Sequence, residues 1–183
     1  AQAQRNRVAG GQAYFVFVGG LHPRKNIWGL LQAFGAYRAM GGKHELVIVG
    51  ESMWSDEMRN QPGVHFSGRL EREMLAATVK ASEGLVFIPW FEGFGVPIVE
   101  AFASGVPVIA SNRTAMPEVC GGAAVALVEP DDAHGIASWM KRLEGDSALR
   151  QEAVERGLAR AQAFSWDDSA AQLWTSIEQV LKP

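Results

Sequence analysis

Short apolar runs alternate along this chain with longer stretches whose apolar residues recur at helical spacing. The runs at residues 14–18, 45–49 and 84–88 are each five residues long, which suits a strand buried in a parallel sheet that is covered on both faces. Between the first two runs, Asn26 precedes a helical pattern that the glycine pair at 41–42 ends. Strand, helix and strand in this order predict a βαβ unit with a right-handed crossover.

The same alternation continues to the end of the chain. Further strands are predicted at residues 63–68, 106–110 and 123–128. Helices are predicted at residues 71–81, from Pro97 onward, at 134–143, at 147–161, and after a capping box at Ser165–Asp168. The sequence therefore predicts an α/β fold with a doubly wound, mostly parallel sheet of about six strands and extra C-terminal helices.

Composition excludes several classes of function. The 183 residues are 48% hydrophobic and 20% charged with a net charge of −3, so no basic field favours nucleic acid as a partner. The single cysteine, Cys120, excludes an internal disulfide, and no apolar stretch approaches the roughly 20 residues of a membrane span. We expect residues 1–13 to be a linker at the start of a piece cut from a larger protein, and residues 14–183 to form one domain.

The segment at residues 88–100 joins a predicted strand to a predicted helix through a glycine-rich loop. Pro89 breaks the strand, Gly93 and Gly95 lie in the loop, and Pro97 suits the first turn of a helix because its missing N–H would be unpaired there. A helix start preceded by glycines presents free backbone N–H groups and the positive end of the helix dipole. These features predict an anion site.

Two carboxylates, Glu92 and Glu100, bracket this predicted anion site. They would repel a phosphate in direct contact, so we assign the phosphate to backbone amides and cations and the carboxylates to hydroxyl groups. A ligand that carries both phosphate and several hydroxyls is a nucleotide sugar. The alternative is that both acids are ordinary solvated or helix-capping residues, which are common in a first helical turn.

The turn at residues 19–26 places Arg24 and Lys25 after the first strand and before a helix, where open α/β sheets bind ligands. Arginine can meet a diphosphate through its fork and lysine as a point charge. The alternative is a solvated basic pair. His22 lies in the same turn, and a lone histidine of this kind is more often structural than catalytic.

The residues from Glu92 to Glu100, continued to Asn112, resemble the E-x7-E region of retaining GT-B glycosyltransferases, and more narrowly glycosyltransferase family 4, also called group 1. The turn at 19–26 resembles the glycine-x-x-x-x-x-lysine segment of this family, with Lys25 at the diphosphate-binding lysine. Many members carry an arginine directly after the first glycine, where this chain has Gly20, so Arg24 would have to replace that contact. The resemblance covers residues 14–181.

The resemblance implies that the chain is the carboxy-terminal, donor-binding lobe and that the amino-terminal acceptor lobe lies outside it. Lys25, with Arg24 as its helper, would stabilise the diphosphate, Glu92 would bind sugar hydroxyls near the reacting centre, and Glu100 would hold the ribose. The backbone at Gly68, Arg69 and Leu70 would face the nucleotide base. The full set of implied donor-binding residues is Gly19, Gly20, Gly68, Arg69, Leu70, Gly93, Phe94, Gly95, Val96 and Glu100.

The whole enzyme would then move a hexose, with retention of configuration, from a nucleoside diphosphate sugar to a glycan or lipid-linked acceptor in polysaccharide or lipopolysaccharide synthesis. The family implies no metal, no cofactor beyond the donor substrate, no nucleic acid, and a cytoplasmic location with peripheral contact at the inner membrane face. The isolated domain should bind donor weakly and transfer poorly. Two alternatives are a non-catalytic nucleotide- or sugar-binding module and a nucleotide-sugar epimerase lobe, and the segment from Glu92 to Glu100 favours the transferase.

Overall fold

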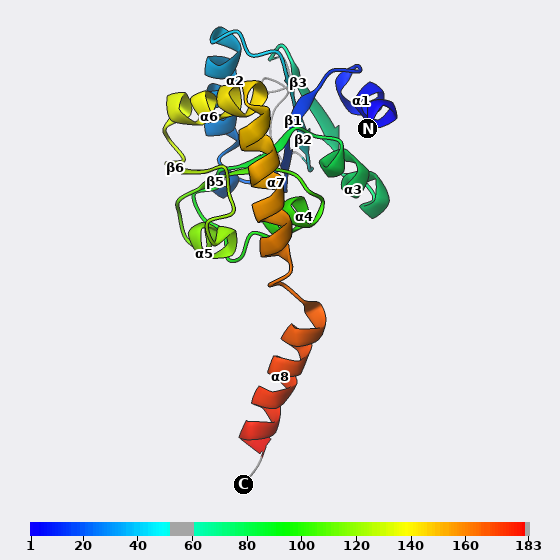
Figure 1. Ribbon diagram of the computed structural model, residues 1–183, viewed down its shortest axis with the longest axis vertical. Coiled ribbons are helices and arrows are strands. Elements are labelled where there is room, and N and C mark those ends of the chain that lie inside the picture. The colour runs from blue at the N-terminus through cyan, green and yellow to red at the C-terminus, as the bar shows by residue number, and fades with distance from the viewer. Residues whose placement is uncertain (52–60, 182–183) are drawn as a thin grey trace.

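The computed structural model describes residues 1–51 and 61–181. A six-stranded sheet has the order β3-β2-β1-β4-β5-β6, and all neighbouring strands are parallel (Figure 1). The strands are β1 (Tyr14–Val18), β2 (Glu45–Val49), β3 (Val64–Gly68), β4 (Gly84–Phe87), β5 (Val108–Ser111) and β6 (Ala126–Val128). The predicted α/β class, the doubly wound sheet and the six strands are confirmed.

Helices cover both faces of the sheet, as the continuous apolar character of its strands requires. They are α1 (Gln2–Ala9), α2 (Ile27–Ala39), α3 (Arg72–Lys80), α4 (Val96–Ala103), α5 (Met116–Cys120), α6 (Ala133–Gly145), α7 (Ser147–Ala161) and α8 (Trp166–Leu181), with a 3-10 turn η1 (Pro23–Lys25). Helix α2 packs against α6, α4 against α7, and α1 against α3. Figure 1 shows the pair α2 and α6 on one side of β1–β3 and the pair α1 and α3 on the other.

The core is built from the central strands. In β1, residues 14–17 are all buried, and the rings of Phe17 and Phe87 stack with centroids 5.9 Å apart across the β1–β4 pair. Helix α7 closes on α4 at Gly157, where an added Cβ would lie 2.7 Å from Phe102. The close approach of these two helices therefore depends on the missing side chain.

Two strands differ from their predicted bounds. The fifth was expected at residues 106–110 and lies at Val108–Ser111, because Pro107 has no N–H to donate and only its carbonyl pairs, with Leu85 N–H at 2.8 Å. The sixth was expected at residues 123–128 and is regular only from Ala126 to Val128.

The segment expected to be a linker contains α1. Its sequence has no apolar stripe, which is why no helix was predicted. Side-chain bonds hold it instead: the Gln4 amide donates to Thr78 Oγ1 at 2.8 Å, and Arg5 forms an ion pair with Glu83. Gly10, with φ +56°, ends the helix in the left-handed conformation that glycine tolerates.

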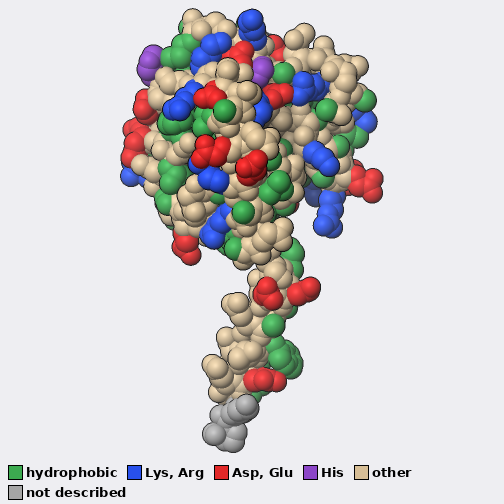
Figure 2. Space-filling view, viewed as in Figure 1, with side chains coloured by type: hydrophobic (Ala, Val, Ile, Leu, Met, Phe, Trp, Pro, Cys, Tyr) green, Lys and Arg blue, Asp and Glu red, His purple; other side chains and the backbone are tan. Residues whose placement is uncertain are grey.

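Helix α8 extends away from the body of the protein (Figure 1) and buries none of its residues. Ser165 Oγ accepts a bond from Asp168 N–H at 3.1 Å, so the predicted cap is present. Trp139 of α6 packs against the core, whereas Trp166 and Trp174 of α8 are 85% and 63% exposed. Figure 2 shows apolar and acidic side chains along α8.

Candidate functional site

The chain reverses its direction across the sheet between β1 and β4. From β1 it proceeds outward through β2 to β3, and from β4 it proceeds the opposite way through β5 to β6. The loops that follow β1 and β4 therefore lie side by side at the carboxyl edge of the sheet. Open α/β sheets bind ligands in the crevice outside the strand ends at such a point. Both loops singled out in the sequence lie at this point.

The loop after β1 delivers two cations to the crevice. Arg24 N–H donates to His22 Nδ1 at 3.3 Å, so His22 caps η1 and has a structural role. The 3-10 turn then directs Lys25 inward, where it is 8% exposed and its Nζ lies 5.1 Å from the centroid of the Phe87 ring. An ammonium group over an aromatic face is stabilised electrostatically. Arg24 remains closer to solvent.

The loop after β4 brings Glu92 to these cations. Glu92 Oε2 accepts bonds from Lys25 Nζ and, at 3.3 Å, from Arg24 Nη1. The main chains also join, because Trp90 N–H donates to the Arg24 carbonyl at 2.8 Å. Lys25, Arg24 and Glu92 thus form one charged cluster across the crevice.

Two opposing influences act on the pKa of Glu92. Burial is the largest and raises it, but the hydrogen bond and charge of Lys25, the charge of Arg24 and the Gly93 N–H together outweigh burial. The pKa of Glu92 therefore lies below its ordinary value, and the side chain is a carboxylate at neutral pH. An ionised acid of this kind accepts hydrogen bonds and stabilises positive charge, but it does not donate a proton.

Helix α4 begins directly after this carboxylate. Gly95 caps it at φ +98°, and a Cβ there would lie 2.8 Å from Met116 Cε, so glycine is required by both conformation and space. Among the described residues of the first turn, only Val96 offers a free N–H, because Pro97 has none and Ile98 N–H donates to the Gly95 carbonyl at 2.9 Å. Phe94 is 47% exposed beside it. This helix start carries the positive end of a dipole at the mouth of the crevice.

Of the other predicted site residues, Gly19, Gly20, Gly93 and Phe94 lie in the two loops of the charged cluster, and the rest lie farther along the chain from it. Glu100 lies one turn into α4 and is exposed as a whole residue. Protein atoms around its carboxyl still exclude part of the solvent, which raises its pKa against the charge of Arg72, and it bonds to no side chain among the described residues. The backbone from Gly68 to Leu70 lies at the end of β3, two strands from β1. Gly50 links the two regions: its N–H donates to the Gly68 carbonyl at 3.0 Å, and an added Cβ would lie 1.9 Å from the Gly19 carbonyl.

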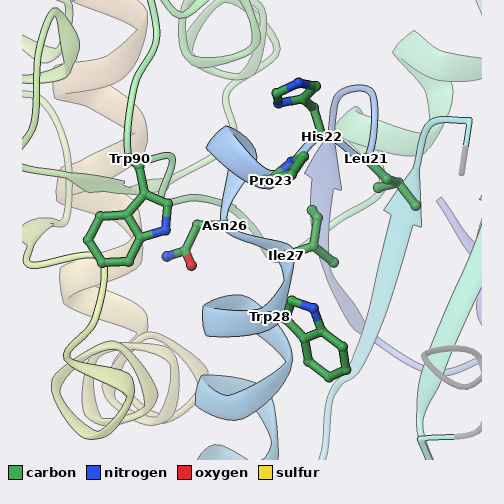
Figure 3. A pocket seen from close by; sticks show the side chains of 7 residues that line it. All are labelled: Leu21, His22, Pro23, Asn26, Ile27, Trp28 and Trp90. Carbon is green, nitrogen blue, oxygen red and sulfur yellow. The ribbon is translucent and has the colours of Figure 1, made fainter. Parts of the chain in front are cut away.

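A small cavity of about 100 Å³ opens beside the same loops (Figure 3). Trp28 lines it from the start of α2 and Trp90 from the loop after β4, with His22 and Pro23 contributed by the loop after β1. The two indole rings are 53% and 44% exposed. The crevice is therefore bordered by aromatic surface as well as charge.

Comparison with known proteins identifies the family to which this site belongs. The model of the glycosyl transferases group 1 matches residues 1–160. This chain is a group 1 glycosyltransferase domain. The O-antigen chain mannosyltransferase B of Escherichia coli is 34% identical over 170 residues, which are 88% of this chain and 44% of that protein. The phosphatidyl-myo-inositol mannosyltransferase of Mycolicibacterium smegmatis is 32% identical over 166 residues, 86% and 42% of the two chains.

Solved structures share the fold of this glycosyltransferase domain. A sucrose-phosphate synthase from Thermosynechococcus elongatus aligns with a TM-score of 0.80 and 25% identity, over 98% of this chain and 49% of that one. WaaG, a glycosyltransferase involved in lipopolysaccharide biosynthesis, aligns with a TM-score of 0.73 at 18% identity. The chain spans less than half the length of these curated relatives and solved structures.

Asn26 has a role in the candidate site that the sequence did not reveal. It was predicted as a helix cap, and its Oδ1 does accept from Gly29 N–H at 3.3 Å. Its buried amide also donates to the carbonyls of Ile88 at 3.2 Å and Pro130 at 2.7 Å. One side chain thus joins the loops after β1, β4 and β6.

Among residues 1–51 and 61–181, no three His, Cys, Asp or Glu side chains are arranged to hold a metal ion. Over these same ranges, no helix combines the length and apolar character needed to cross a membrane.

Proposed function

We propose that this chain is the donor-binding lobe of an enzyme that moves a hexose from a nucleoside diphosphate sugar to a glycan or lipid-linked acceptor. One observation carries the proposal: Lys25 and Arg24 bind Glu92 between the ends of β1 and β4, beside the start of α4. The chain that contains this cluster is a member of the group 1 glycosyltransferase family. Several relatives are named mannosyltransferases, which supports mannose as the first sugar to test and cell-surface polysaccharide or lipopolysaccharide synthesis as the setting.

Different groups of the donor would bind to different parts of the two loops. The diphosphate meets Lys25, Arg24 and the N–H groups of Val96 and of the loop before α4, since cations and a helix N-terminus both favour anions. The hydroxyls of the sugar meet the Glu92 carboxylate, and the ribose extends along α4 toward Glu100. Gly68, Arg69 and Leu70, across the end of β2, border the space left for the base.

Charge then directs the transfer. As the bond between the anomeric carbon and the diphosphate oxygen breaks, negative charge grows on the diphosphate and positive charge on the sugar ring. Lys25 and Arg24 stabilise the first and ionised Glu92 the second, and such preorganised electrostatics is commonly the largest catalytic contribution. The acceptor hydroxyl would form its bond to the anomeric carbon on the face that the diphosphate leaves and pass its proton to the departing diphosphate oxygen, which would retain the anomeric configuration.

A second lobe of the full-length protein would complete the site. The exposed aromatic residues beside the crevice are Trp28, Trp90, Phe91 and Phe94. On α8, the apolar side chains of Trp166, Leu173 and Trp174 are covered by no other part of the described chain. Surface of this kind marks interaction sites. Closure of two lobes over the donor would exclude water and supply the acceptor pocket. The enzyme would work in the cytoplasm, at the inner membrane face when its acceptor is lipid-linked.

Calorimetric titration tests the proposal. The chain and the full-length protein are titrated with UDP, GDP and ADP and with their glucose, mannose and N-acetylglucosamine forms. We expect one nucleotide to bind with Kd in the range of about 1 μM to 1 mM, and Lys25→Ala to abolish the binding. Lys80→Ala, at an exposed lysine on α3, is the matched control. Absence of binding to the folded full-length protein would refute the donor site.

A further inference from the structure

Thr114, in the loop after β5, binds the main chain of Glu92 twice. Glu92 N–H donates to Thr114 Oγ1 at 3.2 Å, and the same hydroxyl donates to the Glu92 carbonyl at 3.0 Å. A hydroxyl can accept and donate at the same time, so this single side chain pairs both main-chain groups of the residue. The contact is between residues 22 positions apart.

The backbone of Thr114 is strained. Its φ of +51° lies in the left-handed region, which a β-branched residue adopts only when its surroundings hold it there. Among residues 1–51 and 61–181, the one other non-glycine residue with positive φ is Asn26, whose amide donates to the Ile88 carbonyl. Both strained residues therefore hold the loop after β4, one at each end of the segment from Ile88 to Glu92. Strain of this kind is concentrated at functional sites.

A second contact fixes the loop after β5 against the loop after β4. Met116, two residues after Thr114, is fully buried, and its Cε fills the space in which a Cβ at Gly95 would lie. The loop after β5 thus contacts the loop after β4 at Glu92 and again three residues later. These two contacts of the loop after β5 hold the loop after β4 in the conformation that directs the Glu92 carboxylate toward Lys25.

We propose that Thr114 is a positioning residue for the transfer, which acts by fixing the main chain of Glu92 so that its carboxylate meets the donor sugar. This inference rests on the proposed function, because it takes Glu92 as the group that binds the sugar. Thr114 has no hydrogen bond to Lys25 or Arg24. Its loss should therefore weaken recognition of the sugar while recognition of the diphosphate remains.

The readout is the ratio between the affinity of the full-length protein for the nucleotide sugar and its affinity for the free nucleoside diphosphate. The probes are the pair that binds best in the panel above, GDP with GDP-mannose or UDP with a UDP-hexose. Thr114→Val should lower this ratio about 3- to 10-fold, the equivalent of one hydrogen bond between the carboxylate and the sugar. The affinity for the free diphosphate should not fall, because Lys25 and Arg24 remain in place. Thr114→Ser, which keeps the hydroxyl, should restore most of the ratio. Thr175→Val, which removes an exposed threonine hydroxyl on α8, should leave it unaltered.

Glu92→Gln distinguishes a failure of the role of Thr114 from a failure of the proposed sugar-binding role of Glu92. If this variant loses the sugar-dependent ratio and Thr114→Val keeps it, the role of Thr114 is refuted and the donor site stands. If Glu92→Gln also keeps the ratio, Glu92 is not the sugar-binding group and the proposed function fails at this residue. Circular dichroism confirms that each variant is folded. Thr114→Gly, which lacks the hydroxyl and adopts a positive φ freely, replaces Thr114→Val if the valine variant does not fold.

Discussion

Glu92→Gln should bind free nucleoside diphosphate more tightly than the wild-type protein, although it should transfer sugar more slowly. In the structure Glu92 binds the two cations that we assign to the diphosphate. A carboxylate and a diphosphate must therefore compete for Lys25 and Arg24. Glutamine has the same shape without the charge, so it removes the competitor and leaves the loop in place.

The size of the effect follows from the exposure of the pair. The side chains of Lys25 and Glu92 are 10% and 16% exposed, so the pair is better shielded than an ordinary surface ion pair. Surface pairs contribute up to about 1 kcal/mol, and a shielded pair should contribute at least about that amount. Because about 1.4 kcal/mol is tenfold in affinity, the diphosphate should bind at least about fivefold more tightly to the variant.

Calorimetry with the free diphosphate at neutral pH measures this gain. The pKa of Glu92 is below its ordinary value, so the wild-type side chain is fully charged under these conditions. Glu118→Gln, at an exposed acid on α5, is the control for the loss of one negative charge. An affinity of Glu92→Gln equal to or below that of Glu118→Gln would show that Glu92 does not compete with the ligand, and the assignment of Lys25 to the diphosphate would be wrong.

Three further predictions concern the fold. Asn26→Ala should lower the free energy of unfolding by about 2–3 kcal/mol, because it removes a helix cap and leaves two buried carbonyls unpaired. Asp132→Ala, which removes only the cap of α6, should lower it by about 1 kcal/mol. Urea denaturation of both variants measures the difference, and equal losses would contradict the prediction. Burial raises the pKa of the Cys120 thiol to about 12, against the charge of Arg160, so thiol reagents should label the protein only after denaturation, and rapid native labelling detected by mass spectrometry would refute the buried position. Burial also lowers the pKa of His44, opposed by the charges of Glu144 and Glu83; the unfolded chain then binds more protons, so the free energy of unfolding should fall as pH decreases below about 6.5. His44→Asn should flatten that part of the stability curve, and an unchanged slope would contradict the prediction.

The elements of the sheet were predictable because each strand and helix has a local signature. Residues 14–18 and 45–49 coincide with β1 and β2, since apolar runs that end in glycine have few other solutions. Helix α1 was missed because its position depends on the bonds of Gln4 to Thr78 in α3 and of Arg5 to Glu83 just after α3, and no local pattern encodes contacts more than 70 residues apart.

The candidate site was predicted as two separate loops. Their glycines, cations and acids are local features, so Lys25 and Glu92 could be singled out independently. Their direct contact depends on the pairing of β1 with β4 and on the conformation of both loops, which sequence patterns do not specify. Thr114 was missed for the same reason, because its strained backbone and its bonds to Glu92 exist only in the folded chain.

After β3 the chain crosses back over the sheet to form β4 beside β1, and this crossing divides the protein into two halves that each hold part of the site. Lys25 belongs to the half that builds β1–β3 and Glu92 to the half that builds β4–β6, and the two residues are 67 positions apart. The charged cluster therefore forms at the boundary between the two half-sheets, where β1 pairs with β4. Two polypeptides separated in the turn after α3 would each lack an essential charge and regain the cluster only on association. Ligand binding at this crevice would then report directly that the two halves had assembled.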